Sequence, residues 1–361
     1  MVYHVIGLMS GSSLDGLDIC YAQYEEIRGK WSAQILASEC IAYSEEWQRN
    51  LQSATTMAVP DFLRLHTAYG RYTGERVRDF IGRNDLEHRV HFVASHGHTV
   101  MHDPLAKTSF QLGDGASVAA TLGLPVISDL RAMDVALGGQ GAPIVPIGDK
   151  LLFGDYALLL NLGGIANITL NEGQRLAFDI CVANQALNAV AAKAGLPYDE
   201  GGKLAASGTL VSSVWDTLCA YDYYSAEAPK SLSNEQAMEM VAAFTDSNDY
   251  SIEDRLHTLV QLIAAQITAA VTRILPDTDI PRRMLVTGGG AFNEYLISVL
   301  QHQLAPLRVT VGIPDAAVAQ NKEALVMGLI GILRWREEAN VEAATTGASR
   351  NSIGGAYWMG A

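Results

Sequence analysis

Three apolar segments of the chain each end abruptly in a glycine-rich turn. The first turn lies in GLMSGSSLDGLD, from Gly7 to Asp18, the second in NLGGIANIT at 161–169, and the third in VTGGGAFN at 286–293. Glycine permits close backbone approach and unusual φ values, and turns of this composition present N–H groups that suit anions. Strand-like and helix-like segments alternate around these turns, which indicates an α/β fold.

The order of the expected elements repeats along the chain. In each half a strand, a small-residue loop and two further strands precede helices, a buried strand and another loop. A length of 361 residues suggests two domains, on a prior of roughly 150 residues each. We therefore expect two α/β domains with a cleft between them: residues 1–140 with about 335–361, and residues 141–334.

Composition excludes several classes of protein. The formal net charge is −14, which disfavours nonspecific binding to nucleic acid or to an anionic membrane. The four cysteines are scattered, which fits a reducing compartment rather than a disulfide scaffold. The longest apolar run, at 324–333, is too short to cross a bilayer, and the first residues do not resemble a signal peptide. A cytoplasmic, soluble protein is expected.

The turn from Gly11 to Gly16 combines glycines with the hydroxyls of neighbouring serines. Its N–H groups would suit phosphate oxygens, and Asp15 and Asp18 would hold the water shell of Mg²⁺. The alternative is a plain hairpin turn, because glycine, serine and aspartate are also turn formers. Neither GxxxxGK[ST] nor GxGxxG occurs in the chain. Bound phosphates would thus be gripped by two opposed hairpins rather than by one P-loop.

Asp179 stands near the end of the apolar segment AFDICVANQ. A buried carboxylate needs a partner or a task, because burying an unpaired charge is costly. Asp179 is therefore a candidate general base. The alternative is that it caps a helix starting near Cys181.

Polar side chains gather in SHGHTVMHDP at 95–104 and in SDLRAMDVALGGQGAP at 128–143. His96 and His98 have the HxH spacing of a metal site, but no second HxH completes a ligand set. They would otherwise contact a polar substrate or serve turn and cap chemistry. Arg131 would grip a carboxylate through two N–H groups, or pair with a neighbouring aspartate. Glu323 begins the last long helix, either facing a cleft or as part of a polar first turn.

Together these stretches resemble the anhydro-N-acetylmuramic acid kinase family, of the actin/hexokinase/Hsp70-like superfamily. The resemblance runs from residue 7 to 324 in family order and includes QLGDGASVAA, PKS at 229–231 and NKEA. It implies two actin-like (ribonuclease H-like) domains with mixed sheets flanked by helices. It also implies an enzyme that uses ATP and Mg²⁺ to phosphorylate 1,6-anhydro-N-acetylmuramic acid at O6 while opening the anhydro ring. The product, N-acetylmuramic acid 6-phosphate, serves recycling of cell-wall sugars.

The resemblance assigns roles to individual residues. Asp179 matches the catalytic base, and Asp15 is the candidate to hold Mg²⁺ through water. The expected substrate contacts are His96, Gly97, His98, Arg131, Asp134 and Glu323. The expected nucleotide contacts are Gly11, Ser12, Ser13, Leu14, Asp15, Gly16, Asn161, Gly163, Gly164, Asn167, Gly288, Gly289, Gly290 and Asn293.

The chain departs from the family pattern at three places. The family reads FDTGPGN where Asp179 is here followed by ICVANQ, although Asn184 is retained. His98 replaces a glutamine, and the run lysine-serine-threonine-glycine-arginine-glutamate reads KSLSNE at 230–235. Three rival functions stay open: a kinase of the same fold for another sugar, a metallohydrolase using His96 and His98, and a nucleotide-binding protein without transferase activity. Homodimers are the commonest assembly by base rate, so a homodimer is a further expectation.

Overall fold

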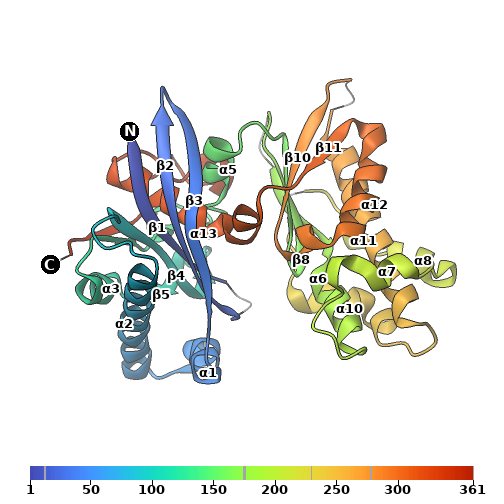
Figure 1. Cartoon of the computed structure of the whole chain (residues 1–361), viewed down its shortest axis with the longest axis horizontal. Coiled ribbons are helices and arrows are strands. Elements are labelled where there is room, and N and C mark those ends of the chain that lie inside the picture. Colours follow the sequence, from blue (N-terminus) through green and yellow to red (C-terminus); the bar gives the residue numbers. More distant parts are fainter. Residues whose placement is uncertain (12–13, 174–175, 229, 277–278, 361) are drawn as a thin grey trace. The chain divides into compact units, whose positions relative to one another are not determined.

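The structure is a computed structural model that describes residues 1–361 except 12–13, 174–175, 229, 277–278 and 361. Backbone contacts divide the chain into two compact units (Figure 1). Unit 1 consists of Met1–Phe153 and Asn321–Ala361, and unit 2 consists of Gly154–Gln320. Each unit has its own sheet and its own helices, as the expected α/β class requires.

Unit 1 is built on a mixed sheet with the strand order β12-β6-β4-β1-β2-β3, and β5 pairs with β4. The first three strands form antiparallel pairs, whereas β4 runs parallel to β1 and β6 parallel to β4. The strands are β1 Val2–Ser10, β2 Gly16–Ile27, β3 Lys30–Ala42, β4 Phe92–Asp103, β5 Thr108–Leu112, β6 Val126–Ser128 and β12 Ala356–Trp358. The helices are α1 Glu45–Ser53, α2 Val59–Arg83, α3 Gly115–Leu122, α4 Ala132–Ala136, α5 Pro146–Leu152, α14 Ala343–Thr346 and the part of α13 (Ala316–Trp335) from Asn321 onward.

Alternate residues of β1 face different helices. Ile6 and Leu8 belong to a core that also contains Tyr69 and Phe80 of α2. On the other face, Gly7 lies against α13, where a Cβ added at Gly7 would come 1.9 Å from the carbonyl oxygen of Ala324. This alternation is the period of two that a strand imposes on its side chains, and it covers both faces of the sheet with helices.

Unit 2 repeats the strand order of unit 1 with the sheet β11-β10-β7-β8-β9. Again the first three strands are antiparallel, while β10 runs parallel to β7 and β11 parallel to β10. The strands are β7 Leu158–Leu162, β8 Ile165–Leu170, β9 Leu176–Val182, β10 Arg282–Thr287 and β11 Val309–Gly312. The helices are α6 Asn184–Ala192, α7 Lys203–Ser207, α8 Ser212–Cys219, α9 Asp222–Ser225, α10 Asn234–Thr245, α11 Ile252–Ile274 and α12 Glu294–Leu304. The repeated order expected from the sequence is thus present in the two sheets.

Two stretches join a different unit from the expected one. Residues 141–153 and 321–334 belong to unit 1, whereas the expected boundaries placed them in the second domain. The reason lies in packing: α5 contacts β3, and the Tyr24 hydroxyl of β2 donates to the carbonyl oxygen of Leu325 in α13 at 2.7 Å. The long helix is also interrupted at Asn321, where the backbone leaves the helical region (φ −115, ψ 18), which is where the two units divide.

Among the described residues, α13 is long and apolar enough to cross a membrane by length and composition alone. However, 72% of its most apolar 18-residue window is buried inside the protein. Leu325, Val326 and Met327 are each 0–1% exposed. The apolar character of α13 is therefore that of a core helix.

Candidate active site

The first glycine turn joins β1 to β2 in unit 1, as the sequence predicts. Ser12 and Ser13 lie outside the described residues, whereas Gly11 and residues 14–16 are described. Leu14 adopts a left-handed conformation (φ 56), and its carbonyl oxygen accepts a hydrogen bond from the Gln48 side chain of α1 at 3.1 Å. Asp15 turns its carboxylate back on the chain and accepts the N–H of Gly16 at 3.0 Å. The turn is therefore anchored from a helix outside it.

A buried network of hydroxyls holds the strand end just before this turn. The Ser10 hydroxyl lies 3.0 Å from Nδ1 of His98, and the Tyr43 hydroxyl donates to Ser10 Oγ at 2.7 Å. Tyr43 also shares a hydrogen bond with Tyr69. Burial lowers the pKa of His98, so this imidazole is neutral near pH 7. Sequence reasoning did not include Tyr43 and Tyr69 in the site, because aromatic residues at such spacing also mark an ordinary core.

His96 and Arg131 form the centre of a second cluster in unit 1. Nε of Arg131 donates to Nε2 of His96 at 2.8 Å, and Nη1 of Arg131 donates to the carbonyl oxygen of Gly141 at 2.6 Å. Burial and the neighbouring Arg131 lower the pKa of His96 to about 3. Burial also lowers the pKa of Arg131 to about 10, against the opposing effect of Glu323. The cluster is thus a neutral imidazole fixed beside a cation.

The segment that carries these histidines is a strand, not a turn. β4 continues through Gly97 to Asp103 and pairs with β5, with a register shift between Thr99 and Met101. The turn-and-cap alternative for this segment is therefore wrong, because the polar residues lie in a hairpin whose far end is exposed. The sequence did not indicate a strand beyond His98 because the residues there are mostly polar.

Asp134 is fully buried, at 0% exposure. Its two carboxylate oxygens accept hydrogen bonds from the N–H of Gly141 at 2.8 Å and from the hydroxyl of Thr346 at 2.7 Å. Both of these partners belong to unit 1. Asp134 therefore fixes the loop whose Gly141 carbonyl orients Arg131. Because its side chain has no exposed surface, it does not contact a ligand directly.

Glu323 is the last of the predicted substrate contacts in unit 1. Its side chain is exposed to solvent, yet the surrounding protein desolvates the carboxyl enough to raise its pKa. Lys322 and Arg131 oppose that rise, whereas Asp18 and Asp149 add to it. Lys322 itself pairs with the buried Asp149 at 2.9 Å. Asp149 was not singled out from the sequence; its buried pairing with Lys322 orients the start of this helix segment.

The second and third glycine turns lie side by side in unit 2. β7 and β10 are parallel neighbours, and Asn161 is opposite Thr287. Gly288 has a φ of 82, and a Cβ there would come 2.6 Å from the Asn161 side chain, so this position requires glycine. Asn184 donates from its side chain to the carbonyl oxygen of Leu162 at 2.8 Å. Asn161, Gly288 and Asn184 thus meet where the neighbouring strands β7 and β10 end.

Main-chain hydrogen bonds tie the second turn to the segment that follows Asp179. The N–H groups of Ala183 and Asn184 donate to the carbonyl oxygens of Gly164 and Gly163 at 2.8 and 3.1 Å. These bonds do not depend on side chains. The residues that replace the family's glycine–proline turn therefore still connect the strand that carries Asp179 to the glycine turn.

Asp179 lies inside β9, opposite Asn167 of β8. Its carboxylate accepts the N–H of Leu232 at 2.9 Å, and its main chain bonds both Lys230 and the Tyr223 hydroxyl. Burial raises the pKa of Asp179, and the Leu232 N–H opposes that rise. The helix-cap alternative is wrong, because α6 starts at residue 184 and its N-cap is Ala183. Asp179 is a partly buried carboxylate with one fixed donor.

Asn293, expected near the nucleotide, is the N-cap of α12. Its side chain accepts the N–H of Leu296 at 3.0 Å. A Cβ at Gly202 would come 2.1 Å from Asn293 Oδ1, so the short helical turn 200–202 packs directly on this residue.

The residues of the first turn fit a magnesium ion held largely through phosphates and water. Asp15 raises the pKa of Asp18 in addition to the larger effect of burial, so the two carboxylates feel each other's charge. Oxygen ligands from one or two carboxylates are what Mg²⁺ takes when phosphates complete its shell. The pair therefore fits such an ion.

The zinc alternative does not fit the histidines. The ring nitrogens of His96 are engaged by Arg131 and by the carbonyl oxygen of Gly97 at 2.9 Å. His98 is bonded to Ser10. Across the described part of the chain, no three His, Cys, Asp or Glu side chains group as metal ligands, whereas a catalytic zinc site uses three.

Two solved structures resemble the chain distantly. One is component A of the (R)-2-hydroxyglutaryl-CoA dehydratase from Acidaminococcus fermentans (TM-score 0.47, 14% identity, 91% of this chain and 96% of that chain). The other is the activator of the 2-hydroxyisocaproyl-CoA dehydratase from Clostridium difficile with bound ADPNP (TM-score 0.46, 16% identity, 92% and 96%). Both are too distant to bear on function.

The sequence comparisons cover nearly the whole chain. A family model described as anhydro-N-acetylmuramic acid kinase matches residues 3–360. Proteins of that name from Paramagnetospirillum magneticum and Methylobacterium nodulans are 32% and 33% identical to this chain. The first alignment covers 98% of both chains, and the second covers 97% of this chain and 98% of the relative. The chain belongs to the anhydro-N-acetylmuramic acid kinase family.

Proposed function

We propose that this protein is an ATP-dependent kinase that phosphorylates 1,6-anhydro-N-acetylmuramic acid at O6 and hydrolytically opens the anhydro ring. The product would be N-acetylmuramic acid 6-phosphate, an intermediate in recycling cell-wall sugars. The observation that carries the proposal is Asp179: a desolvated carboxylate, held by the Leu232 N–H, on the sheet whose edge presents two adjoining glycine turns. The family match over residues 3–360 supplies the substrate.

Unit 2 supplies the groups for nucleotide and base. The turns at Asn161–Gly164 and Gly288–Gly290 offer main-chain N–H groups to phosphate oxygens, and Asn167 lies opposite the base. Gly11–Gly16 of unit 1 is the further phosphate turn. Bound Mg²⁺, held by Asp15 and Asp18 through water, would neutralise phosphate charge. Catalysis of phosphoryl transfer depends mostly on such positioning and charge stabilisation.

Unit 1 supplies the groups for the sugar. Arg131, fixed by His96 and the Gly141 carbonyl, has the fork geometry that binds a carboxylate such as the lactyl group. His98 and Glu323 offer hydrogen bonds to sugar hydroxyls, and Gly97 lies between the two histidines. Asp134 supports Arg131 through the Gly141 loop.

The reaction balances with water as a reactant. Asp179 accepts a proton from water while the water oxygen bonds to the anomeric carbon. The bond from that carbon to O6 breaks, and O6 bonds to the γ-phosphorus as ADP leaves. The proton passes from Asp179 to solvent, so one water and one phosphoryl group are added to the sugar.

The test is one incubation with ATP, Mg²⁺ and 1,6-anhydro-N-acetylmuramic acid in water enriched in oxygen-18. The expected product has gained a phosphoryl group and one labelled water oxygen, retained at the anomeric carbon. Phosphate transfer without water uptake, or transfer only to another sugar, would replace this function by the same-fold sugar kinase. Nucleotide binding without transfer to any sugar would contradict kinase activity itself.

The use of ATP implies a cytoplasmic location for this reaction. A homodimer is a separate expectation, which light scattering coupled to gel filtration measures directly. A mass of one chain, 38.8 kDa, would contradict it.

A further inference from the structure

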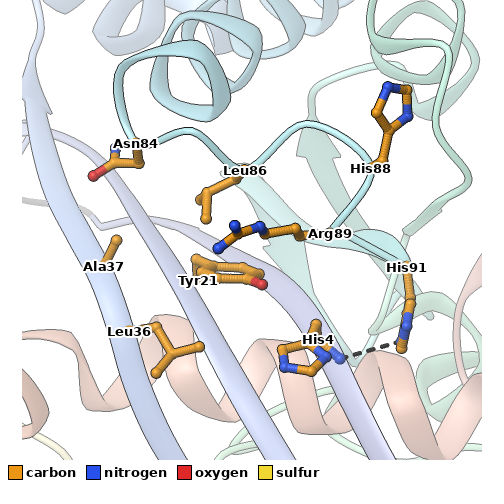
Figure 2. A pocket seen from close by; sticks show the side chains of 9 residues that line it. All are labelled: His4, Tyr21, Leu36, Ala37, Asn84, Leu86, His88, Arg89 and His91. Carbon is orange, nitrogen blue, oxygen red and sulfur yellow. Dashed lines mark hydrogen bonds between the residues drawn. The ribbon is translucent and has the colours of Figure 1, made fainter.

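A pocket of about 590 Å³ lies in unit 1, away from the turns described above. The strands β1, β2 and β3 form its floor, and the loop after α2 forms its rim (Figure 2). It is lined by His4, Tyr21, Leu36, Ala37, Asn84, Leu86, His88, Arg89 and His91. Six residue steps of β1 separate His4 from Ser10, which is ~20 Å at about 3.3 Å per residue. The pocket is therefore distinct from the phosphate turn.

The pocket carries a cation and, among the described residues, no carboxylate. Its lining includes Arg89 but no described aspartate or glutamate, in a chain with 39 acidic and 25 basic residues. Asp85 and Glu87 belong to the same loop, yet neither lines the pocket. An anion entering here would meet no carboxylate of the lining.

Arg89 is the cation that a ligand would meet. Within the described residues its guanidinium has no ion pair and no hydrogen bond, whereas Arg83 near the same loop pairs with Glu39. In Figure 2 the guanidinium extends over Tyr21 into the pocket, while the ring of His88 at the rim is directed away from it. Arg89 is exposed, and an unpaired arginine fork beside a pocket suits a carboxylate or a phosphate.

His91 is fixed as a second donor. Its Nδ1 accepts the main-chain N–H of His4 at 3.2 Å, the bond drawn in Figure 2. Nδ1 is therefore unprotonated, which leaves the proton of the neutral ring on Nε2. Burial and the charge of His4 lower the pKa of His91, in agreement with this neutral tautomer. The His4 ring supports this arrangement. It stacks on the Tyr21 ring with 6.1 Å between the ring centroids, and it lies edge-on to the His91 ring with 5.6 Å between the centroids.

The opposite side of the pocket is apolar. Leu36 is 46% exposed although it lines the pocket, while Leu86 and Tyr21 are nearly buried and present firm walls. A few oriented donors beside apolar walls, in a pocket of ~300–1,000 Å³, is the usual make-up of a small-molecule site.

We propose that this pocket binds a small organic anion, in which one carboxylate or phosphate group is attached to an apolar body. The charged group contacts the Arg89 guanidinium, and the apolar body lies against Leu36, Leu86 and the Tyr21 ring, with Nε2 of His91 at the other end of the pocket. The site is separate from the proposed kinase reaction, and its occupancy does not depend on that function.

The test is a titration of the full chain with phenyl phosphate and with benzoate, followed by calorimetry and by the histidine ring signals in NMR. Saturating Mg²⁺ and ADP are present so that the nucleotide site is filled. We expect saturable binding that shifts the His4 and His91 signals but not those of His96 and His98. The two probes distinguish a preference for phosphate from one for carboxylate. Benzyl alcohol, which lacks the charge, should bind at least tenfold more weakly.

Arg89→Gln should weaken binding of the anionic probes by about tenfold or more, since charge-assisted hydrogen bonds contribute ~1.5–3 kcal/mol and 1.4 kcal/mol is tenfold. Arg71→Gln, at an exposed arginine of α2, is the matched control and should bind as the parent does. Equal affinity of Arg89→Gln and the parent would overturn the proposal. So would the absence of saturable binding, or equal affinity for benzyl alcohol.

Discussion

The two units share a strand order but hold their first turns in different ways. In unit 1 two side chains anchor the turn after β1, because Gln48 bonds Leu14 and His98 bonds Ser10, beside one main-chain bond from Tyr43 to Asp15. In unit 2 two main-chain N–H groups, those of Ala183 and Asn184, anchor the turn after β7, beside one side-chain bond from Asn184 to Leu162. A change of side chain can break the first kind of anchor, whereas the second survives most substitutions.

The ionisable groups differ in the same sense. Arg131 of unit 1 is oriented by the imidazole of His96 and a carbonyl, and so needs a specific partner. Asp179 of unit 2 is oriented by the amide of Leu232, which any residue except proline supplies. Two of the three departures from the family pattern, after Asp179 and at 230–235, fall in unit 2, where main-chain bonds hold the geometry. The third is His98 of unit 1, where the replacing side chain still bonds Ser10. Unit 2 therefore tolerates divergence around a fixed carboxylate, whereas a replacement in unit 1 has to keep the hydrogen bond of its side chain.

The largest effect is expected at Asp179, the candidate base of unit 2. Asp179→Asn keeps an oxygen for the Leu232 N–H but cannot accept a proton, so turnover should fall by ~10²–10⁴. Binding of nucleotide and sugar, followed by calorimetry, should change little. Asp216→Asn, at an exposed position of unit 2, is the control and should turn over normally. Near-native turnover of Asp179→Asn would remove the base from the mechanism.

A smaller effect is expected at Arg131 of unit 1, whose guanidinium bonds the His96 side chain. Arg131→Lys keeps the charge but cannot bond His96, Gly141 and a carboxylate together. The KM for the sugar should rise about tenfold to a hundredfold, from a loss of ~1.5–3 kcal/mol. Arg78→Lys, exposed on α2, controls for the change in side-chain length. An unaltered KM would mean that Arg131 only supports the fold.

The bond between His98 and Ser10 should matter less. His98→Ala leaves the Ser10 hydroxyl short of one partner, and kcat/KM should fall about fivefold, the equivalent of ~1 kcal/mol for a hydrogen bond. His98→Gln, which restores the family residue, should recover activity to within about twofold of the parent because glutamine can bond the same hydroxyl. If both variants lose activity equally, the role of His98 is not this bond.

The smallest effect is expected at Leu232, because its main-chain N–H rather than its side chain bonds Asp179. Asp179 works only when ionised, and burial raises its pKa, so turnover should be lost on acidification at a higher pH than for an ordinary aspartate. Leu232→Thr, the family residue, should leave both the rate and this acid limb unchanged, because the N–H that opposes the rise is retained. A displaced limb in the pH–rate profile of Leu232→Thr would show that the side chain contributes.

Sequence patterns predicted elements well where periodicity was strong. The strand expected before the second glycine turn is β7, and the strand expected after it is β8. They failed where polar residues continue a strand, as in β4 beyond His98. They also failed where a distant element decides membership of a unit, as for α5 and α13. Burial against another part of the chain leaves no local signal.

The site was predictable in its side chains but not in its main-chain contacts. Asp179, Arg131 and the glycine turns could be named because their residue types are chemically distinctive. The amide of Leu232 and the hydroxyl of Tyr43 could not, because one is independent of residue type and the other resembles an ordinary core aromatic. The pocket at Arg89 combines three strands and a loop, and no single stretch of sequence marks it.

The close contact between Gly7 and Ala324 couples the position of the first glycine turn to that of the Glu323 carboxylate. Gly7 precedes the first phosphate turn by a few residues, and Ala324 directly follows Glu323. Even one added methyl group at residue 7 would press the helix away from the strand and displace the carboxylate and the turn in the same movement. A change of acceptor sugar would therefore have to come from replacing Glu323 or residues of the first glycine turn, while residue 7 stays glycine.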